Sequence, residues 1–330
     1  MKVFSINTEL DKVTGVQKVL MDIHRAISSD YDAKIVGTLN YSDVNPLHNI
    51  MRNEYIKWRN PFIFYNSIVF VHERKLLLIF KLLNIFLFQR IKLIYIHHNI
   101  FSSHRYTTIL PKTIVSISDK VTDNLVNYFK APLNHIYKIY NCVQDIHPNK
   151  HKSINNTINI IYPARINSVK RQIDVYNHLN GKISKDINIL FVGIGPEFEK
   201  LKKTISNNHQ FKVLGFREDI LDLIQNSDYV LLFSKHEGLP ITLIEATMCG
   251  TPIICNDVGG NCEIAYNNEN AFVVNEWEEL IETLNMLSTV EEETYKKMSK
   301  KSRQIYEENF TFEKFKENYL KLLKKISNES

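Results

Sequence analysis

The sequence predicts an α/β protein with two doubly wound domains that face a cleft. Its 330 residues are enough for two domains of ordinary size. In each half, at least five apolar, strand-like runs alternate with helical segments. Such alternation is typical of Rossmann-like parallel sheets covered by helices on both faces. We therefore expect one domain at residues 1–150 and a second at residues 151–310.

Charge is unevenly distributed along the chain. The net charge is +5, but residues 1–150 contain 19 lysines and arginines against 11 acidic residues (19 − 11 = +8). Residues 151–330 contain 22 against 25 (22 − 25 = −3). A basic half can bind nucleic acid, anionic lipid or a phosphorylated acceptor. No motif of an RNA- or DNA-binding module is present, so we expect no nucleic-acid partner.

Cysteine spacing and hydropathy predict a cytoplasmic protein. The four cysteines have neither the spacing of a zinc site nor that of a disulfide framework, and we expect reduced thiols. No signal peptide is visible at the start of the sequence, and no stretch reaches the roughly 20 apolar residues that span a bilayer. Peripheral attachment to the inner face of the cytoplasmic membrane is compatible with this prediction.

The first domain begins with a strand at residues 2–7, a loop, and an amphipathic helix at residues 16–27. Gly15 stands just before this helix. A glycine there lets the backbone approach a ligand closely, and the start of the helix offers free N–H groups. An ordinary turn glycine is the alternative. A second strand follows at residues 33–39, and residues 41–66 are irregular, aromatic and basic.

A buried strand at residues 67–73 precedes an apolar block at residues 74–92, which is flanked and interrupted by positive charge. One interpretation is a helix packed on the sheet. The other is a helix with part of its face in a membrane interface, where basic flanks contact anionic headgroups. The two interpretations are compatible.

Two histidines lie near the end of the next strand, at residues 92–99. Open parallel sheets bind ligands at the carboxyl ends of their strands. Because adjacent side chains of a strand point to opposite faces, at most one of His97 and His98 needs to face the cleft. Further strands at residues 113–118 and 135–143 complete the domain, and polar residues 145–157 form the expected linker.

The second domain opens with a strand at residues 159–164 that leads to Arg165, and Lys170 follows at the start of the next helix. Two fixed cations beside a cleft suit a diphosphate. They neutralise both the bound anion and the charge that develops on a leaving group. Two solvated surface cations are the alternative, which the apolar strand before Arg165 disfavours. Later in the chain, Phe216 and Arg217 follow another strand.

Residues 237–263 are the stretch around which this domain is organised. A helix that begins near Pro240 directs free N–H groups toward the carboxyl ends of the strands, where an anion is stabilised. Glu245 lies in the first two turns of this helix, and its carboxylate can reach the same place. Glu237 lies in the loop before it. Carboxylates are poor phosphate ligands but accept hydrogen bonds from ribose and sugar hydroxyls, so the pattern indicates a sugar attached to a nucleotide diphosphate.

Residues 234–264 resemble the donor-site signature of the retaining GT-B glycosyltransferases of the family-4 type, the glycosyl transferases group 1. The signature has two glutamates separated by seven residues, here Glu237 and Glu245, then Gly-Thr-Pro, and then Gly-Gly with a following glutamate. The resemblance covers nearly the whole chain. It implies a GT-B architecture and a last helix, residues 311–330, that crosses back to the first domain.

The resemblance also implies roles for individual residues. Arg165 and Lys170 would hold the leaving diphosphate, and Glu245 would bind the ribose. Glu237 would hold sugar hydroxyls, and His98 would orient donor or acceptor. The residues implied in catalysis are His98 and Glu237, and those implied in donor binding are Gly15, Arg165, Lys170, Phe216, Arg217, Gly238, Leu239, Pro240 and Glu245. The chain departs from the family pattern at four positions where relatives have glycine, namely Thr14, Cys142, Ala164 and Arg171.

What the resemblance implies is a retaining, metal-independent hexosyltransferase that needs no cofactor besides its nucleotide diphosphate sugar co-substrate. The leaving phosphate would accept the proton of the acceptor. We expect transfer of a hexose or amino-hexose to a hydroxyl of a lipid-linked saccharide, in the assembly of a surface polysaccharide such as lipopolysaccharide or capsule. The alternatives are a nucleotide-sugar epimerase or a sugar phosphorylase of the same fold, and a non-catalytic subunit that binds a nucleotide sugar.

Overall fold

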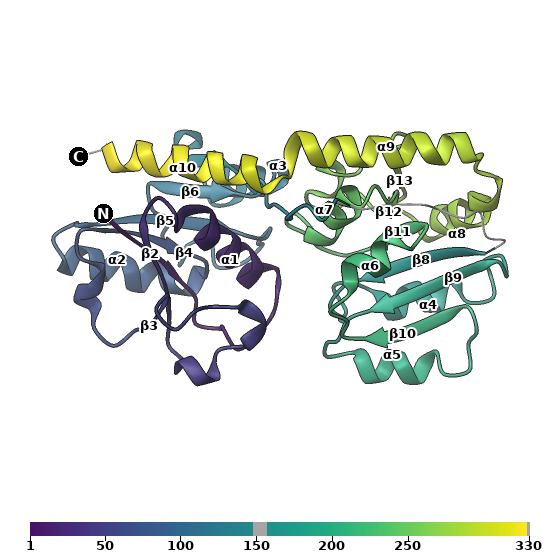
Figure 1. Cartoon of the computed structure of the whole chain (residues 1–330), viewed down its shortest axis with the longest axis horizontal. Helices are drawn as coiled ribbons and strands as arrows, with labels where there is room; N and C mark the ends of the chain where they lie inside the picture. Colours follow the sequence, from purple (N-terminus) through teal and green to yellow (C-terminus); the bar gives the residue numbers. More distant parts are fainter. Residues whose placement is uncertain (148–156, 329–330) are drawn as a thin grey trace. The chain divides into compact units, whose positions relative to one another are not determined.

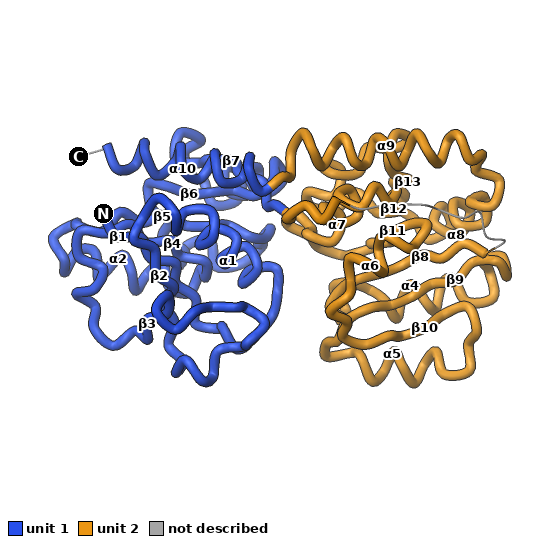
Figure 2. The backbone as a smooth tube through the Cα atoms, viewed as in Figure 1, with its two compact units in different colours: residues 1–142, 312–330 blue, residues 143–311 orange. Residues whose placement is uncertain are grey.

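The computed structural model describes residues 1–147 and 157–328. The chain forms two compact units (Figure 2): unit 1 comprises Met1–Cys142 and Phe312–Ser330, and unit 2 comprises Val143–Thr311. The first crossing between them falls after Cys142, before the boundary expected at residue 150. Most of the linker predicted at residues 145–157 lies outside the described residues.

Within the described residues, unit 1 contains a seven-stranded sheet in the order β3-β2-β1-β4-β5-β6-β7 (Figure 1). All of its neighbouring strands pair in parallel. Their bounds are β1 Lys2–Ile6, β2 Asp32–Gly37, β3 Tyr55–Lys57, β4 Ser67–Val71, β5 Ile91–His97, β6 Thr113–Ser116 and β7 Ile136–Lys138. The chain runs outward from β1 to β3 on one side and from β4 to β7 on the other, so the sheet has its topological switch point between β1 and β4.

Helices from both ends of the sequence pack on this sheet. They are α1 Gly15–Ile27, α2 Leu77–Phe86, α3 Asp119–Asp123 and α10 Phe312–Asn328. In α10, the ring of Tyr319 lies 5.9 Å from the ring of Phe70 in β4. Lys92 Nζ donates a hydrogen bond to the carbonyl of Ile326 at 2.7 Å. The last helix is therefore part of unit 1.

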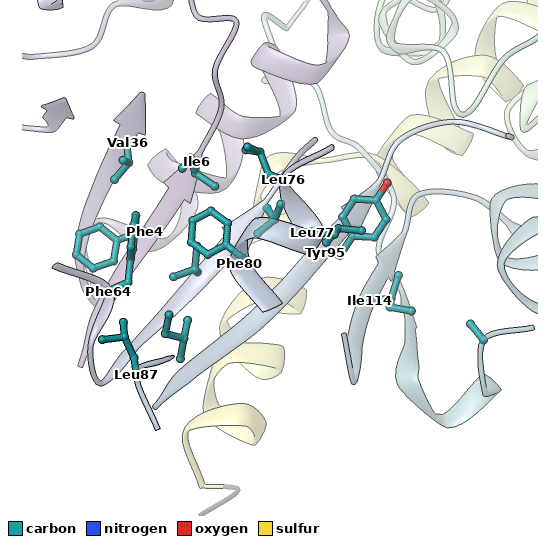
Figure 3. Packing of buried hydrophobic residues seen from close by; sticks show 14 of the residues in the cluster. Phe4, Ile6, Val36, Phe64, Leu76, Leu77, Phe80, Leu87, Tyr95 and Ile114 are labelled. Atoms are coloured by element: carbon teal, nitrogen blue, oxygen red, sulfur yellow. The ribbon is translucent and has the colours of Figure 1, made fainter. Parts of the chain in front are cut away.

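An apolar core joins α2 to the sheet of unit 1 (Figure 3). Phe80 of α2 is fully buried, and its ring lies 5.0 Å from that of Phe64, which lies 5.3 Å from that of Phe4 in β1. Phe64 belongs to the 3-10 turn Pro61–Phe64, inside the segment expected to be irregular. Each buried phenylalanine contributes about 1.5–3 kcal/mol, so this turn anchors the segment to the core.

The apolar block predicted at residues 74–92 is not one continuous helix. Helix α2 ends at Phe86, and the chain turns through Phe88 and Gln89, which both have positive φ. It then enters β5 at Ile91. The prediction of a helix packed on the sheet is correct for the inner face of α2, whereas the outer face is exposed.

Within the described residues, unit 2 contains a six-stranded parallel sheet in the order β10-β9-β8-β11-β12-β13. The strand bounds are β8 Ile158–Pro163, β9 Ile187–Val192, β10 Phe211–Gly215, β11 Tyr229–Leu232, β12 Ile253–Cys255 and β13 Ala271–Val273. The helices are α4 Gln172–Leu179, α5 Phe198–Thr204, α6 Ile220–Gln225, α7 Ile241–Met248, α8 Trp277–Met286 and α9 Glu292–Asn309. The switch point of this sheet lies between β8 and β11.

Both units are doubly wound α/β domains, so the predicted fold class is confirmed. None of the helices in the described part of the chain combines the length and the apolar character that a membrane span needs. All four cysteines are free thiols. The cleft between the two domains stays a prediction.

Candidate active site

The candidate site of unit 2 lies at the switch point of its sheet. β8 and β11 are hydrogen-bonded neighbours, but the chain continues to opposite sides after each of them. The loop after β8 carries Arg165 and Lys170, and the loop after β11 carries Glu237 through Pro240. Open α/β sheets bind their ligands at this position.

An ion pair joins the two loops. Lys170 Nζ lies 2.5 Å from Glu237 Oε1. The side chain of Glu237 is only 7% exposed, and that of Lys170 is 22% exposed. A buried charge is strongly unfavourable unless it is paired, so the lysine stabilises the ionised glutamate. The sequence predicted both residues at the site, and the structure brings them into direct contact.

The hydroxyl of Tyr162, a residue of β8 that the sequence analysis did not single out, also bridges the two loops. Tyr162 is fully buried. Its hydroxyl donates a hydrogen bond to the carbonyl of Lys170 and accepts one from the amide of Phe233 at 3.0 Å. Burial raises the pKa of Tyr162, so the hydroxyl keeps its proton. The tyrosine therefore fixes the backbone beneath the ion pair.

A second bridging residue, Asn256, follows β12. Its amide oxygen accepts a hydrogen bond from the amide of Ser234 at 3.0 Å, and its amide nitrogen donates to the carbonyl of Ser234 at 2.7 Å. Asn256 is buried and its polar groups are satisfied within the protein. No sequence motif marks either Asn256 or Tyr162, because each acts through a strand neighbour distant in the sequence.

The Gly-Gly pair of the signature supports the loop that carries Glu237. Gly259 has φ of +55°, and a Cβ atom at this position would lie 2.0 Å from the carbonyl oxygen of Glu237. The next residue, Gly260, donates its amide hydrogen bond to the carbonyl of Gly238 at 2.8 Å. Only glycine permits this approach of two backbones, so the glycine of the signature is required by the packing of its backbone against the Glu237 loop.

Helix α7 begins at Ile241 with Pro240 at its N-cap, as expected. Thr242 Oγ1 donates to the carbonyl of Pro163 at 3.0 Å, which fixes the start of α7 to the end of β8. The first turn contains no acidic residue, so its N–H groups and dipole favour an anion. Glu245 lies one turn further and is buried. Gly238 and Leu239, in the loop before the helix, are buried as well.

Arg165 lies at the end of β8 and is exposed. Its carbonyl accepts a hydrogen bond from Gln172 Nε2 at 3.2 Å. With respect to the residues that the structure describes, its guanidinium makes no hydrogen bond or ion pair. The side chain can therefore turn toward a ligand without breaking a contact within the described part of unit 2.

The departure from the family pattern at Arg171 has a physical explanation. Arg171 has φ of +55°, a left-handed conformation that favours glycine. Here the guanidinium lies 4.3 Å from the ring centre of Trp277 and 5.2 Å from that of Phe233. Cation–π contacts of this kind contribute about 0.5–2 kcal/mol, and they offset the strain of the backbone.

The loop that follows β10 carries the residues expected against the nucleobase. Phe216 is 48% exposed, and Arg217 binds Asp219 through both its Nε and its terminal nitrogen. β10 is the edge strand, two positions from β8. Since neighbouring strands lie about 4.8 Å apart, the loop that carries Phe216 and Arg217 starts about 10 Å from the end of β8.

In unit 1, His98 follows β5 and contacts another histidine. His98 Nε2 lies 3.2 Å from Nδ1 of His72, and the two rings stack. His97 has different neighbours, since its ring contacts the hydroxyl of Tyr95 and the side-chain oxygen of Asn124. Burial lowers the pKa of His98 to about 3 and the pKa of His97 to about 4, so both rings are neutral at pH 7. His72 was not predicted from the sequence.

Gly15 is the first residue of α1, and Thr14 is the N-cap. The Thr14 hydroxyl accepts a hydrogen bond from the amide of Val16 at 3.3 Å. Gly15 is not among the residues with positive φ, so helix geometry alone does not require glycine there. Threonine at the position where relatives have glycine is explained by this cap.

Comparison with known proteins gives a family match in unit 2. Residues 143–305 match the family model of the glycosyl transferases group 1. The chain is 28% identical over 169 residues to N-acetyl-alpha-D-glucosaminyl L-malate synthase of Bacillus anthracis, covering 48% of this chain and 43% of that protein. It is also 28% identical over 230 residues to the capsular polysaccharide biosynthesis glycosyltransferase CapH of Staphylococcus aureus, covering 61% of this chain and 63% of that protein. The chain thus spans about two fifths to three fifths of the length of these relatives.

Solved structures resemble the chain over nearly all of its length. Anabaena Alr3699/HepE in complex with UDP has a TM-score of 0.83 at 17% identity, covering 98% of this chain and 100% of that chain. A glycosyltransferase from Rickettsia africae has a TM-score of 0.82 at 19% identity, covering 100% and 99%. At these identities the similarity establishes the fold.

Proposed function

From the glycosyl transferases group 1 domain in residues 143–305, we propose that the protein is a retaining glycosyltransferase of GT-B architecture. It moves a hexose or amino-hexose from a nucleotide diphosphate sugar to a hydroxyl of a saccharide acceptor. The observation that carries the proposal is the Lys170–Glu237 ion pair at the switch point of unit 2, beside the start of α7. A cation, a helix start and buried carboxylates together suit a ligand with both phosphate and hydroxyl groups.

Lys170 has the chemistry that a leaving diphosphate requires. An ammonium group has three N–H donors, so Lys170 can keep its contact with Glu237 and still donate to a phosphate oxygen. Arg165 adds a second cation from the same loop. As the bond from the anomeric carbon to the diphosphate breaks, the electron pair passes to the phosphate oxygen. The two cations and the N-terminus of α7 stabilise that charge.

The remaining residues bind and orient the donor. Glu237 accepts hydrogen bonds from sugar hydroxyls, and Glu245 accepts them from the ribose. The loop through Gly238, Leu239 and Pro240 lies against the donor. Further contributions to donor binding come from Phe216, Arg217 and Gly15.

The acceptor oxygen attacks the anomeric carbon on the face from which the diphosphate leaves, and its proton passes to a phosphate oxygen. The neutral ring of His98 hydrogen-bonds donor or acceptor near the reacting carbon. Because the leaving phosphate takes the proton, the step requires neither a metal nor a cofactor.

The names of similar proteins support the substrate classes. Anabaena HepE was solved in complex with UDP-glucose, and the relative CapH is named for capsular polysaccharide biosynthesis. UDP-hexoses are therefore the donors to test first. We propose that the acceptor is a lipid-linked saccharide in the assembly of a surface polysaccharide, at the cytoplasmic face of the membrane.

Product analysis tests this function. UDP-hexoses and UDP-amino-hexoses are incubated with the protein and with saccharide acceptors, free or linked to a polyprenyl diphosphate, with and without EDTA. A new glycosidic bond whose anomeric configuration by NMR equals that of the donor, formed equally with EDTA, supports the proposal. An inverted anomer contradicts the retaining mechanism, and a loss of activity in EDTA contradicts metal independence. An epimerised donor supports an epimerase instead, and release of a sugar 1-phosphate from the saccharide when inorganic phosphate is supplied supports a phosphorylase.

A further inference from the structure

Helix α2 of unit 1 is apolar on both sides, although only one side is buried. Leu77 and Phe80 face the core and are almost fully buried. The opposite side exposes the side chains that we call the α2 face: Leu78, Ile79, Leu82, Ile85, Phe86 and Phe88. Leu82 is 60% exposed, Phe86 62% and Phe88 82%. Contiguous exposed apolar surface of this kind marks an interaction site.

The surroundings of the α2 face hold it in place. The ring of Phe62, which is itself exposed, lies 5.9 Å from the ring of Phe86 and extends the apolar surface. The side chain of Asn84 makes two hydrogen bonds to the backbone of Ile91, at 2.8 and 2.9 Å, which fix the turn after the helix. This turn presents Phe88 with φ of +56°. A bulky residue keeps such a conformation only where the surrounding structure determines it.

The segment around the α2 face is strongly basic. Residues 55–118 contain nine lysines and arginines but one acidic residue, Glu73. Some of these cations already interact with other groups of the chain, since Lys75 pairs with Glu73 at 2.7 Å and Lys92 donates a hydrogen bond to the carbonyl of Ile326. The side chains of Lys81 and Arg90 are exposed and, among the described residues, make no ion pair or hydrogen bond.

Exposed Arg59, three residues before Phe62, likewise has no ion pair or hydrogen bond with any residue of the described ranges. Free positive charge is therefore found on α2 itself, in the turn after it and beside the 3-10 turn that packs on it. Apolar surface with basic residues around it is complementary to an anionic lipid interface.

We infer that the α2 face docks unit 1 on the surface of an anionic phospholipid membrane. The apolar side chains enter the boundary between headgroups and acyl chains, while Lys81, Arg90 and Arg59 contact the headgroups. α2 has ten residues and is about 15 Å long, half the thickness of the hydrocarbon core, so it lies along the interface. A second copy of the chain on this face would bring the same cations together in a two-fold contact, which disfavours self-association.

This inference does not rest on the proposed glycosyl transfer, and its test uses no donor. The full chain is floated on a density gradient with vesicles of phosphatidylcholine alone or of equal parts phosphatidylcholine and phosphatidylglycerol. We expect flotation with the anionic vesicles, little with the neutral ones, and weaker binding as salt screens the charges.

Two variants and two matched controls identify the surface. The apolar variant is Leu82→Gln/Phe86→Gln/Phe88→Asn, in which asparagine suits the left-handed position. Its control changes exposed apolar residues elsewhere in unit 1, Tyr106→Gln/Leu133→Gln. The charge variant is Lys81→Gln/Arg90→Gln, and its control changes exposed lysines of α5 in unit 2, Lys200→Gln/Lys202→Gln.

The apolar variant should lose flotation, and the charge variant should bind roughly 30-fold more weakly, since each basic residue near an anionic surface contributes about 1 kcal/mol. Both controls should bind like the wild type, and unchanged circular dichroism and melting temperature show that the variants fold. Absence of wild-type flotation, equal binding to neutral vesicles, or undiminished binding of the apolar variant would each overturn the inference. So would a wild-type dimer that dissociates in the apolar variant while vesicles are ignored.

Discussion

Removal of Lys170 should destabilise unit 2 more than removal of its partner. In Lys170→Met, the Glu237 carboxylate, 7% exposed, loses the cation 2.5 Å away. Breaking a buried ion pair in this way costs about 3–5 kcal/mol, and the 22% exposure of Lys170 reduces the expected loss to about 2–3 kcal/mol. In Glu237→Gln the lysine can still reach water, so we expect a loss of about 1 kcal/mol.

The double variant Lys170→Met/Glu237→Gln separates pairing from packing. It removes both charges of the pair, and its free energy of unfolding should lie within about 1 kcal/mol of the wild-type value. Urea unfolding followed by circular dichroism, on all four proteins without donor, measures the coupling energy of the cycle. If Lys170→Met is as stable as the wild type, or if the two single changes simply add, the two side chains do not stabilise each other and the reasoning is refuted.

Three further predictions concern the support of the site and the core of unit 1. Tyr162→Phe should lower the free energy of unfolding by about 1–3 kcal/mol in urea melts, because two backbone groups lose a buried partner; a stability equal to the wild type would contradict the bridging role. Gly259→Ala should abolish the compact form of unit 2 or its ligand binding, as seen by proteolysis and calorimetry, because the new Cβ meets the Glu237 carbonyl. Gly181→Ala, at φ of +74° with nothing within 4 Å, should lose only about 1 kcal/mol, and equal damage from both changes would refute the steric argument. The pKa of His97 is about 4 in the folded protein, below its ordinary 6.5. The stability contributed by the neutral ring is therefore complete above pH 6.5 and is lost as the pH falls toward 4, by about 1.4 kcal/mol per pH unit. In urea melts, the free energy of unfolding should fall less steeply with decreasing pH in His97→Gln than in the wild type, and identical slopes would contradict the buried neutral ring.

The sequence was sufficient to predict that candidate site residues lie at the ends of β8 and β11. Arg165 follows an apolar strand, and Glu237 precedes a helix that starts at a proline, and both features are local. The contact between Lys170 and Glu237 is not local, because it depends on β11 pairing with β8 rather than with β10. Strand order is decided by packing over the whole domain, which no short motif encodes.

Residues that support the backbone of the site loops were the hardest to predict. Tyr162 looks like any aromatic residue of a buried strand, and Asn256 like any polar residue after one. Their hydrogen bonds reach residues 71 and 22 positions away. The left-handed Arg171 gave a clearer signal, because it stands where relatives of the family have glycine. The role of Trp277 beneath it appeared only with the structure.

The two faces of α2 illustrate a different limit. The sequence predicted an apolar helix near residues 74–92, but apolar residues occur on every side of that helix, so the pattern alone does not show which side is buried. Which side is buried follows from the packing of Phe80 on Phe64, which in turn packs on Phe4. The exposed positions could be assigned only once that packing was known. The same holds for the difference between Lys81, which is exposed, and Lys92, which donates a hydrogen bond to the carbonyl of Ile326.

The most direct test of the proposed donor site is calorimetric titration of the full chain with UDP and a panel of nucleotide sugars. Wild type is compared with Glu245→Gln and with Lys200→Ala, an exposed lysine of α5, as control. We predict binding of at least one nucleotide sugar, unchanged in the control and at least about tenfold weaker in Glu245→Gln, because hydrogen bonds to a charged acceptor are stronger than those to an amide by about 1 kcal/mol or more each. If no nucleotide or nucleotide sugar binds, or if Glu245→Gln binds as tightly as the wild type, unit 2 does not hold a donor in the way proposed.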